Sequence, residues 1–226
     1  QALESIRQAL ARTGLPEAEV YYHGARRGLS RFANTELGQN TLLDEQNAIA
    51  RVVRNGAVGN ASTSDLSVEG LLAAIGRADA IAKASPPVEG FAGLNPAAAG
   101  RTPPPVRWAE STAAMTAEGR AALLAPVFER VRKAGLKAAG VLETTAGQFA
   151  FLSTTGLEHA FRTTAASFRF FALGPADNVS GFGGVLHRDI EKVDVRGISE
   201  SAVEKCLAGK DPTEVEPGDY DVVLEP

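Results

Sequence analysis

The amino-acid sequence predicts an α+β fold, with antiparallel sheets flanked by helices. Stretches with apolar residues at helical spacing lie at the start and end of each half of the chain, and β-type runs bounded by turn residues lie between them. The order helix, about four β segments, helix therefore occurs twice. This order indicates a pseudo-duplicated unit whose helices cover one face of each sheet.

The first α+β unit is predicted over residues 1–85. It opens with an amphipathic helix, and it ends with a second helix that has Ser67 as its N-cap. Among the β-type runs between these helices is residues 46–63. In that run Asn55-Gly56 stands between two apolar stretches, which is the strongest short hairpin signal in the sequence.

A proline-rich connector without periodicity, residues 86–110, precedes the second α+β unit, which is predicted over residues 111–215. The second unit opens with a helix in which Pro126 predicts a kink or a break. The small residues Ala146-Gly147 predict a hairpin turn between two β runs. A Thr- and Phe-rich run and a glycine-rich run complete the β segments, and a last helix is predicted to end at Gly209.

The final eleven residues, "EPGDYDVVLEP" at 216–226, predict the start of a buried strand after a Pro217-Gly218 turn. No later helix or hairpin in the sequence could cover the apolar run at 222–224. We therefore expect residues 216–226 to begin a further, C-terminal domain.

Composition is ordinary for a soluble globular protein, with 44% apolar and 22% charged residues in a chain of 226. The 23 basic and 27 acidic side chains give a net charge of -4, which argues against a surface that is basic throughout. No apolar run is long enough to cross a membrane, and the amphipathic start does not resemble a signal peptide. The single cysteine, Cys206, excludes an internal disulfide. These features predict a cytoplasmic protein.

The sequence offers no complete catalytic constellation. The histidines His23, His159 and His187 lie far apart in the sequence, and none belongs to a standard metal-binding motif. The glycine-rich run at 180–184 lacks the Lys-Ser/Thr pair of a phosphate-binding loop, and Cys206 lies on the apolar side of a helix. We therefore predict no catalytic, metal-binding or cofactor-binding residue in this chain.

Several segments together resemble the TldD/PmbA family, whose members are also known as modulators of DNA gyrase. The main match is "ARVVRNGAVGNASTSDLSVEGLLAAIGRADAIAKAS", residues 50–85. The stretches "ANTELGQNT" and "VEPGDYDVVLEP" are similar to further landmarks of the family. The resemblance covers nearly all of the chain as the N-terminal portion of such a protein, and "ASTSDLS" favours the PmbA (TldE)-like branch.

The resemblance implies a cytoplasmic zinc metallopeptidase that acts on unfolded peptides as a homodimer, or as a heterodimer with a family paralogue. It places the zinc-binding HExxxH motif of the TldD-type subunits in the C-terminal domain, outside this sequence, and the PmbA-like subunits lack that motif. This portion is then expected to shape substrate access and dimer contacts. A non-enzymatic regulator, or a purely structural dimerisation module, is the alternative. The absence of a basic stretch interleaved with aromatic residues counts against direct contact with nucleic acid.

Peptide contacts are predicted where β segments have small, polar faces, as in "GNASTS" and "RTTAAS". An extended peptide can add to the edge of an antiparallel sheet through main-chain hydrogen bonds that are largely independent of its sequence. Two arginines beside the predicted hairpin could also bind a carboxylate or a peptide carbonyl, although a solvated sheet face is the simpler interpretation. The residues predicted to face a peptide are Arg51, Arg54, Asn60, Ser62 and Thr63.

Overall fold

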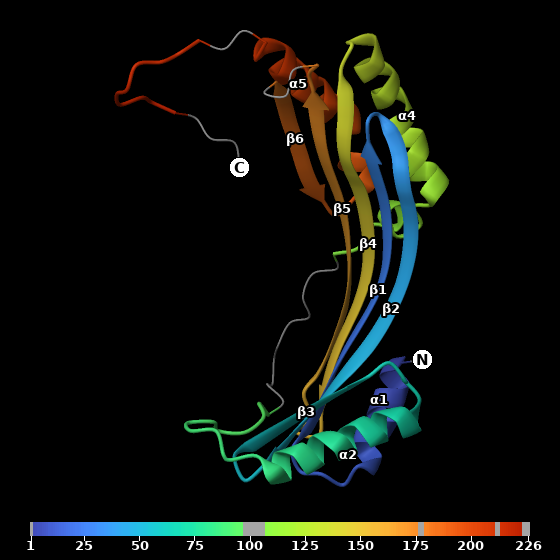
Figure 1. Ribbon diagram of the computed structural model, residues 1–226. Helices are drawn as coiled ribbons and strands as arrows, with labels where there is room; N and C mark the ends of the chain where they lie inside the picture. The colour runs from blue at the N-terminus through green and yellow to red at the C-terminus, as the bar shows by residue number, and fades with distance from the viewer. Residues whose placement is uncertain (1, 97–106, 176–178, 211–212, 223–226) are drawn as a thin grey trace.

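A computed structural model describes residues 2–96, 107–175, 179–210 and 213–222. Its centre is one long, curved antiparallel sheet of six strands in the order β3-β2-β1-β4-β5-β6 (Figure 1). The strands are β1 (Ala18–Ala33), β2 (Glu36–Arg54), β3 (Ala57–Thr63), β4 (Lys137–Ser153), β5 (Glu158–Leu173) and β6 (Ser180–His187).

The helices lie at the two ends of this sheet (Figure 1). One pair, α1 and α2, packs at the end where β3 lies, and the other pair, α4 and α5, packs at the end where β6 lies. The helices are α1 (Ala2–Arg12), α2 (Val68–Ala84), α3 (Glu110–Ala113), α4 (Ala117–Lys133), the short 3-10 helix η1 (Ile190–Lys192) and α5 (Val195–Ala208).

The predicted fold class, an antiparallel sheet flanked by helices, is confirmed, and the same order of elements occurs in both halves. Each half contributes three strands rather than about four β segments, because the first runs of each half join into single long strands. All six strands belong to one continuous sheet, in which β1 and β4 pair along the middle.

The hairpin at Asn55-Gly56 is confirmed, with both residues at positive φ (51° and 79°) between β2 and β3. The hairpin at Ala146-Gly147 is wrong. Gly147 lies inside β4 in extended backbone and pairs with strands on both sides, so its lack of a side chain does not mark a turn there. The chain turns instead before Gly156, which has a φ of 90°. Nor is there a break at Pro126, since α4 continues through it.

Matching hydrogen bonds show that the two halves are arranged alike. The tip of the β1–β2 hairpin binds the start of β4: Thr35 N–H donates to the Ala138 carbonyl (3.0 Å), and Ala138 N–H donates to Thr35 Oγ1 (2.9 Å). The tip of the β4–β5 hairpin binds the start of β1 in the same way, through Thr154 and Ala18 at 2.8 and 2.9 Å. Each hairpin tip is thus held by the other half, which supports the pseudo-duplication.

The helices pack closely on the two edge strands, because each of these strands carries a glycine under a helix. A Cβ on Gly59 of β3 would lie 1.9 Å from the carbonyl oxygen of Ala78 in α2. A Cβ on Gly181 of β6 would lie 1.9 Å from the carbonyl oxygen of Ala202 in α5. No side chain fits at either position without moving the helix, so glycine sets the approach of helix to sheet in both halves.

Two separate cores lie under the two helix pairs. The core under α1 and α2 is built from aliphatic residues such as Val20, Leu71 and Ile75, together with Ala150 and Leu152 from the second half. The core under α4 and α5 is larger and rich in phenylalanine. Both cores use the same alternate residues of β1, so both helix pairs cover the same face of the sheet.

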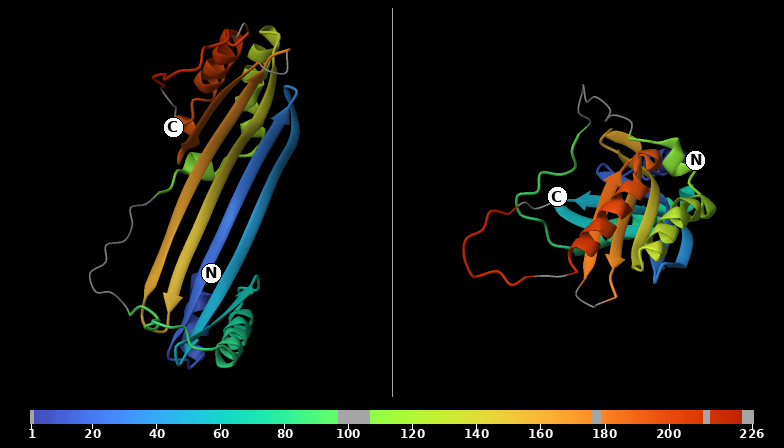
Figure 2. Two further views of the ribbon diagram at one scale, coloured as in Figure 1. Left: turned by 60° about the vertical axis from the view of Figure 1, so that its left-hand side comes forward. Right: turned by 90° about the horizontal axis from the view of Figure 1, so that it is seen from above.

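The opposite face of the sheet has no helix packed on its side chains within the described residues, and we call it the bare face. The strands can be followed over most of their length from this side (Figure 2). Large apolar side chains are exposed on it, among them Tyr21 (37%), Phe161 (40%) and Phe182 (44%). Exposed apolar side chains that gather on one face of a sheet commonly mark an interaction surface.

The connector prediction can be compared with the structure only in part, because residues 97–106 lie outside the described residues. The described residues of the connector before α3 form no helix and no strand of the sheet. The predicted strand start at 222–224 lies mostly outside them as well, and Val222 itself is exposed and not in a strand. Within the described part of the chain, no helix is long and apolar enough to cross a membrane.

Candidate functional site

The five residues predicted to face a peptide all lie on or beside β2 and β3, at one edge of the sheet. The alternation of side chains divides them between its two faces. Arg51 lies opposite Asn60 on the bare face, with Ser62 two residues further along β3. Arg54 and Thr63 lie on the face that carries the helices. The prediction from sequence therefore combined two groups of residues that the sheet separates.

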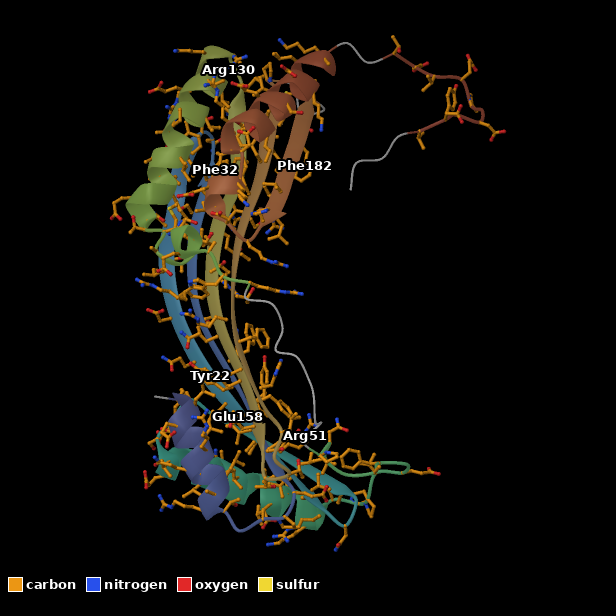
Figure 3. All side chains as sticks on the ribbon, turned by 180° about the vertical axis from the view of Figure 1, so that it is seen from behind. Tyr22, Phe32, Arg51, Arg130, Glu158 and Phe182 are labelled. Carbon is orange, nitrogen blue, oxygen red and sulfur yellow. The ribbon has the colours of Figure 1, made fainter. Side chains whose placement is uncertain are left out.

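Arg51 is close to a buried carboxylate on the neighbouring strand. Its Nη1 lies 3.0 Å from Oε1 of Glu19, whose side chain is only 6% exposed (Figure 3 labels Arg51). The two atoms are within ion-pair distance, yet Oε1 of Glu19 accepts no well-aligned hydrogen bond among the described residues. Burial raises the pKa of Glu19, and the charge of Arg51 opposes this shift. Arg51 thus has a charge to balance already, which limits its use for a second carboxylate.

Arg54 is held by a helix. Its Nε donates to Oδ1 of Asp79 in α2 at 2.5 Å, and Lys83 lies 2.6 Å from the other oxygen of the same carboxylate. The hydrogen bonds from Arg54 and Lys83 lower the pKa of Asp79. This cluster ties α2 to the end of β2. This contact gives Arg54, which follows Val52 and Val53 at the end of β2, a structural role.

Thr63 begins the turn into α2. Its Oγ1 accepts from the N–H of Asp65 at 3.1 Å, and the Asp65 carboxylate accepts from the N–H of Ser67, the helix N-cap, at 3.0 Å. The side chains of Asn60 and Ser62 are exposed and take no part in such contacts among the described residues. Of the predicted set, Arg51, Asn60 and Ser62 therefore remain available to a ligand on the bare face.

Two stretches of open sheet edge are the main feature that the sequence did not reveal. The edge strand β3 pairs only with Ala48–Arg54 of β2, so no strand within the described residues covers the outer edge of β2 over 36–47. Almost every residue of that stretch is exposed. Likewise β6 pairs only with Ala166–Leu173 of β5, and Arg107 forms an isolated bridge to Thr163. The edge of β5 over 158–162 is open in the described structure (Figure 2).

A row of aromatic rings runs across the bare face to the open edge of β5. His23, Phe149 and Phe161 are directly opposite one another on three neighbouring strands. Their rings stack with centroid distances of 4.7 and 4.9 Å, and His159 lies 6.0 Å from Phe161. The sequence shows each of these residues in a β run. Only the register between strands, which depends on the hairpin turns, places them in one row.

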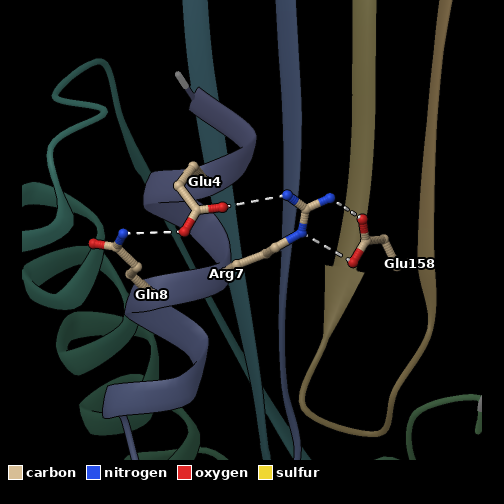
Figure 4. Close-up of polar contacts among 4 residues, drawn as sticks. All are labelled: Glu4, Arg7, Gln8 and Glu158. Carbon is tan, nitrogen blue, oxygen red and sulfur yellow. Dashed lines mark hydrogen bonds and ion pairs between the residues drawn. The ribbon is translucent and has the colours of Figure 1, made fainter.

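The lower end of this edge is joined to the first helix by an ion pair. Arg7 of α1 binds the carboxylate of Glu158 through Nε and Nη2, and it also contacts Glu4, which accepts from Gln8 (Figure 4). Arg7 and Glu158 are both about half exposed, so the pair adds little stability. It fixes the orientation of α1 relative to the β4–β5 hairpin.

Within the described residues, no group of three or more His, Cys, Asp or Glu side chains lies close enough to hold a metal ion. His187 ends β6 and its Nδ1 accepts from the N–H of Asp189 at 3.0 Å, so it forms part of a turn. Cys206 is fully buried in the second core, and burial raises the pKa of its thiol. These contacts account for both residues as structural.

Comparison with protein-family models finds one match: residues 18–82 match "PmbA/TldA metallopeptidase domain 1". This match spans β1 to β3 and most of α2, and it includes all five residues predicted to face a peptide. A comparison with curated proteins finds no match.

Solved structures with the same fold include TldE from Thermococcus kodakarensis, which has a TM-score of 0.78 and 21% sequence identity and covers 92% of this chain. A "putative modulator of a DNA gyrase" from Thermotoga maritima has a TM-score of 0.78 at 15% identity and also covers 92%. A "putative modulator of DNA gyrase" from Bacteroides thetaiotaomicron has a TM-score of 0.77 at 16% identity and covers 97%. The chain spans about half of each of these proteins, namely 47%, 48% and 51% of their lengths.

Proposed function

We propose that this chain is the N-terminal portion of a TldD/PmbA-family protein, a subunit of a cytoplasmic metallopeptidase that acts on unfolded peptides. The match to a metallopeptidase domain and the likeness to TldE support this proposal. The stretch "ASTSDLS" (61–67) favours a TldE-like subunit. Such a subunit acts in a homodimer or in a heterodimer with a family paralogue. Any zinc in this dimer would be bound by the C-terminal domain of a subunit, outside this chain.

The role proposed for this chain is to hold an extended peptide at an open sheet edge. The carrying observation is the edge of β2 over 36–47, a stretch of twelve residues, all exposed except Thr41, with no partner strand among the described residues. In the part of the chain that the structure describes, only at Thr41 does a side chain already use a backbone group of this stretch, since Arg120 Nη2 donates to its carbonyl at 3.2 Å. An extended chain that pairs there satisfies its own main-chain groups and those of β2 together. Since the contacts are made by the backbone, a site of this kind accepts unfolded chains of many sequences.

Arg51, Asn60 and Ser62 add polar side chains on the bare face near the same edge of the sheet. Arg54 and Thr63 contribute from the other side by fixing α2 and its N-terminal turn. The proposal therefore assigns peptide contact to the first three residues and support of the edge to the other two.

Backbone-methylated peptides test this function in the full-length protein. We expect an unstructured peptide to slow amide hydrogen exchange in β2, and a shuffled version of the peptide to bind with a Kd within about threefold of the original, because main-chain pairing reads no side chains. The same peptide with N-methyl groups at successive residues lacks the donors, and its Kd should rise by at least about tenfold.

Two results would contradict the proposal. One is unchanged exchange throughout residues 18–187 at saturating peptide. The other is equal affinity for the methylated peptide. Zinc content and peptide hydrolysis of the full-length protein separate a peptidase subunit from a non-enzymatic regulator of the kind suggested by the gyrase-modulator names of two matched structures.

A further inference from the structure

A hollow with cationic walls lies beside the open edge of β5. Its volume is about 720 Å³, and it is formed where the end of the connector, β5 and the turn after β6 meet. The charged and titratable residues that line it are Arg107, His187, Arg188, Asp189 and Lys192.

A single buried threonine holds the walls of this hollow in place. Thr164 of β5 is 2% exposed, and its N–H donates to the Arg107 carbonyl at 2.9 Å. Its Oγ1 donates to the Arg188 carbonyl at 2.9 Å and accepts from the N–H of Ala109 at 2.9 Å. A second buried hydroxyl, that of Thr112, also donates to the Arg188 carbonyl, at 2.8 Å. The backbones that carry Arg107 and Arg188 are therefore fixed to the same residue of the sheet.

The positive charge in the hollow is only partly balanced. Arg107, Arg188 and Lys192 are exposed and form no ion pair within the described residues. The one carboxylate in the lining, Asp189, accepts from Ser111 Oγ at 2.6 Å and from the N–H of Glu191 at 3.1 Å. Three cations beside one carboxylate, which is already hydrogen-bonded, form a site that attracts a further anion.

We propose that this hollow binds a carboxylate group of a peptide whose main chain lies along the open edge of β5. This inference rests on the proposed function for its ligand, an unfolded peptide, but it places that peptide at the second open edge of the sheet, that of β5, and adds a preference for acidic peptides. A peptide strand that follows the edge over 158–162 arrives at the hollow where the bridge between Arg107 and Thr163 ends the open stretch. Arginine offers paired N–H donors that match a carboxylate, and lysine adds a further charge.

Trp108 gives this site an internal reporter. It lines the hollow, the guanidinium carbon of Arg162 lies 4.5 Å from its ring centroid, and its Nε1–H donates to Glu110 at 2.8 Å. An anion that draws arginine side chains toward itself changes the surroundings of this ring. The part of the emission change due to Trp108 is the part that is lost in Trp108→Phe.

The experiment compares peptides of one sequence that differ in their carboxylates, with the full-length protein. A fluorescein-labelled peptide with Asp residues is set against the same peptide with Asn, and each is made with a free and with an amidated C-terminus. We expect the Asp peptide, or the free C-terminus, to bind about tenfold more tightly than its neutral counterpart, as one or two charge-assisted hydrogen bonds provide. The two pairs show whether the side chain or the C-terminus supplies the carboxylate.

The triple variant Arg107→Gln/Arg188→Gln/Lys192→Gln should remove this preference, because it removes all three cations of the hollow, while a neutral peptide keeps the affinity that main-chain pairing provides. Arg130→Gln, which removes one charge from the outer side of α4, is the control and should keep the preference (Figure 3 labels Arg130). Equal affinity for acidic and neutral peptides would overturn this inference and leave the proposed function in place. A preference that persists in the triple variant would place the anion site elsewhere and overturn it as well. If no peptide binds at all, both proposals fail.

Discussion

The two ends of the sheet share one architecture but fill it differently. Each end has a helix pair on the same face of the sheet, a glycine under the second helix, and a hairpin tip of the other half whose threonine bonds to the start of a strand. Among the described residues, the core under α1 and α2 consists of alanine, valine, leucine and isoleucine with one aromatic residue, Tyr22, and no phenylalanine. The end under α4 and α5 packs Phe32, Phe128, Phe168 and Phe170 together, with ring centroids 5.2 to 6.5 Å apart. The glycines under the helices and the threonine hydrogen bonds at the hairpin tips are thus common to both ends, whereas different sets of apolar side chains fill the two cores.

The largest expected losses of stability at the two ends come from their cores. Phe168→Ala removes a fully buried ring from the phenylalanine cluster and should lower the free energy of unfolding by about 4 kcal/mol. Ile75→Ala, at a matched buried position under α2, should cost about 3 kcal/mol because a smaller side chain is lost. Urea denaturation measures both. Equal losses would show that the larger side chain of Phe168 contributes no more to stability than that of Ile75.

The glycine positions test whether the two halves are equivalent. Gly59→Ala and Gly181→Ala each place a Cβ against a helix carbonyl, and each should cost about 3 kcal/mol because the helix must move off the sheet. Gly76→Ala, on the exposed side of α2 with open space around it, is the control and should raise stability by about 1 kcal/mol. If only one of the two substitutions caused a small loss of stability, the helix over that strand would be able to move away from the sheet at little cost. The two halves would then share their topology but not the tight packing of helix on strand.

The smallest expected losses of stability concern the threonines at the hairpin tips. Thr35 is 3% exposed, so Thr35→Val leaves the N–H of Ala138 buried without an acceptor and should cost about 2 kcal/mol. Thr154 is only half-buried, so water can replace its hydroxyl, and Thr154→Val should cost about 1 kcal/mol. Thermal or urea unfolding of the two variants decides the order. The reverse order would contradict the burial argument.

Local signals in the sequence predicted the elements well, because each depends on a few neighbouring residues. Ser67 as N-cap of α2, the end of α5 at Gly209 and the Asn55-Gly56 hairpin follow from backbone conformation and capping. The turn at Ala146-Gly147 was wrong because a glycine in a strand looks like a turn when its pairing partners are unknown. Gly147 pairs with Ala25 and Thr163, which lie in other parts of the chain.

The candidate site was predictable only in part for the same reason. Arg51, Asn60 and Ser62 were found from their residue types beside a hairpin. That Arg54 lies on the other face follows from the alternation in β2, but its bond to Asp79 depends on where α2 packs. The open edges of β2 and β5 result from β3 and β6 being shorter than their neighbours, and strand lengths are known only when the register is known.

The central pairing of β1 with β4 has a consequence for biosynthesis. Ala18 and Thr154, which bind each other, are separated by 136 residues. When the ribosome has released the first eighty-odd residues, the aliphatic core still lacks Ala150 and Leu152, and β1 has a free edge along its whole length. The nascent chain therefore keeps a strand edge exposed until most of the second half has been translated, and an unpaired edge of this kind can pair with other chains and aggregate.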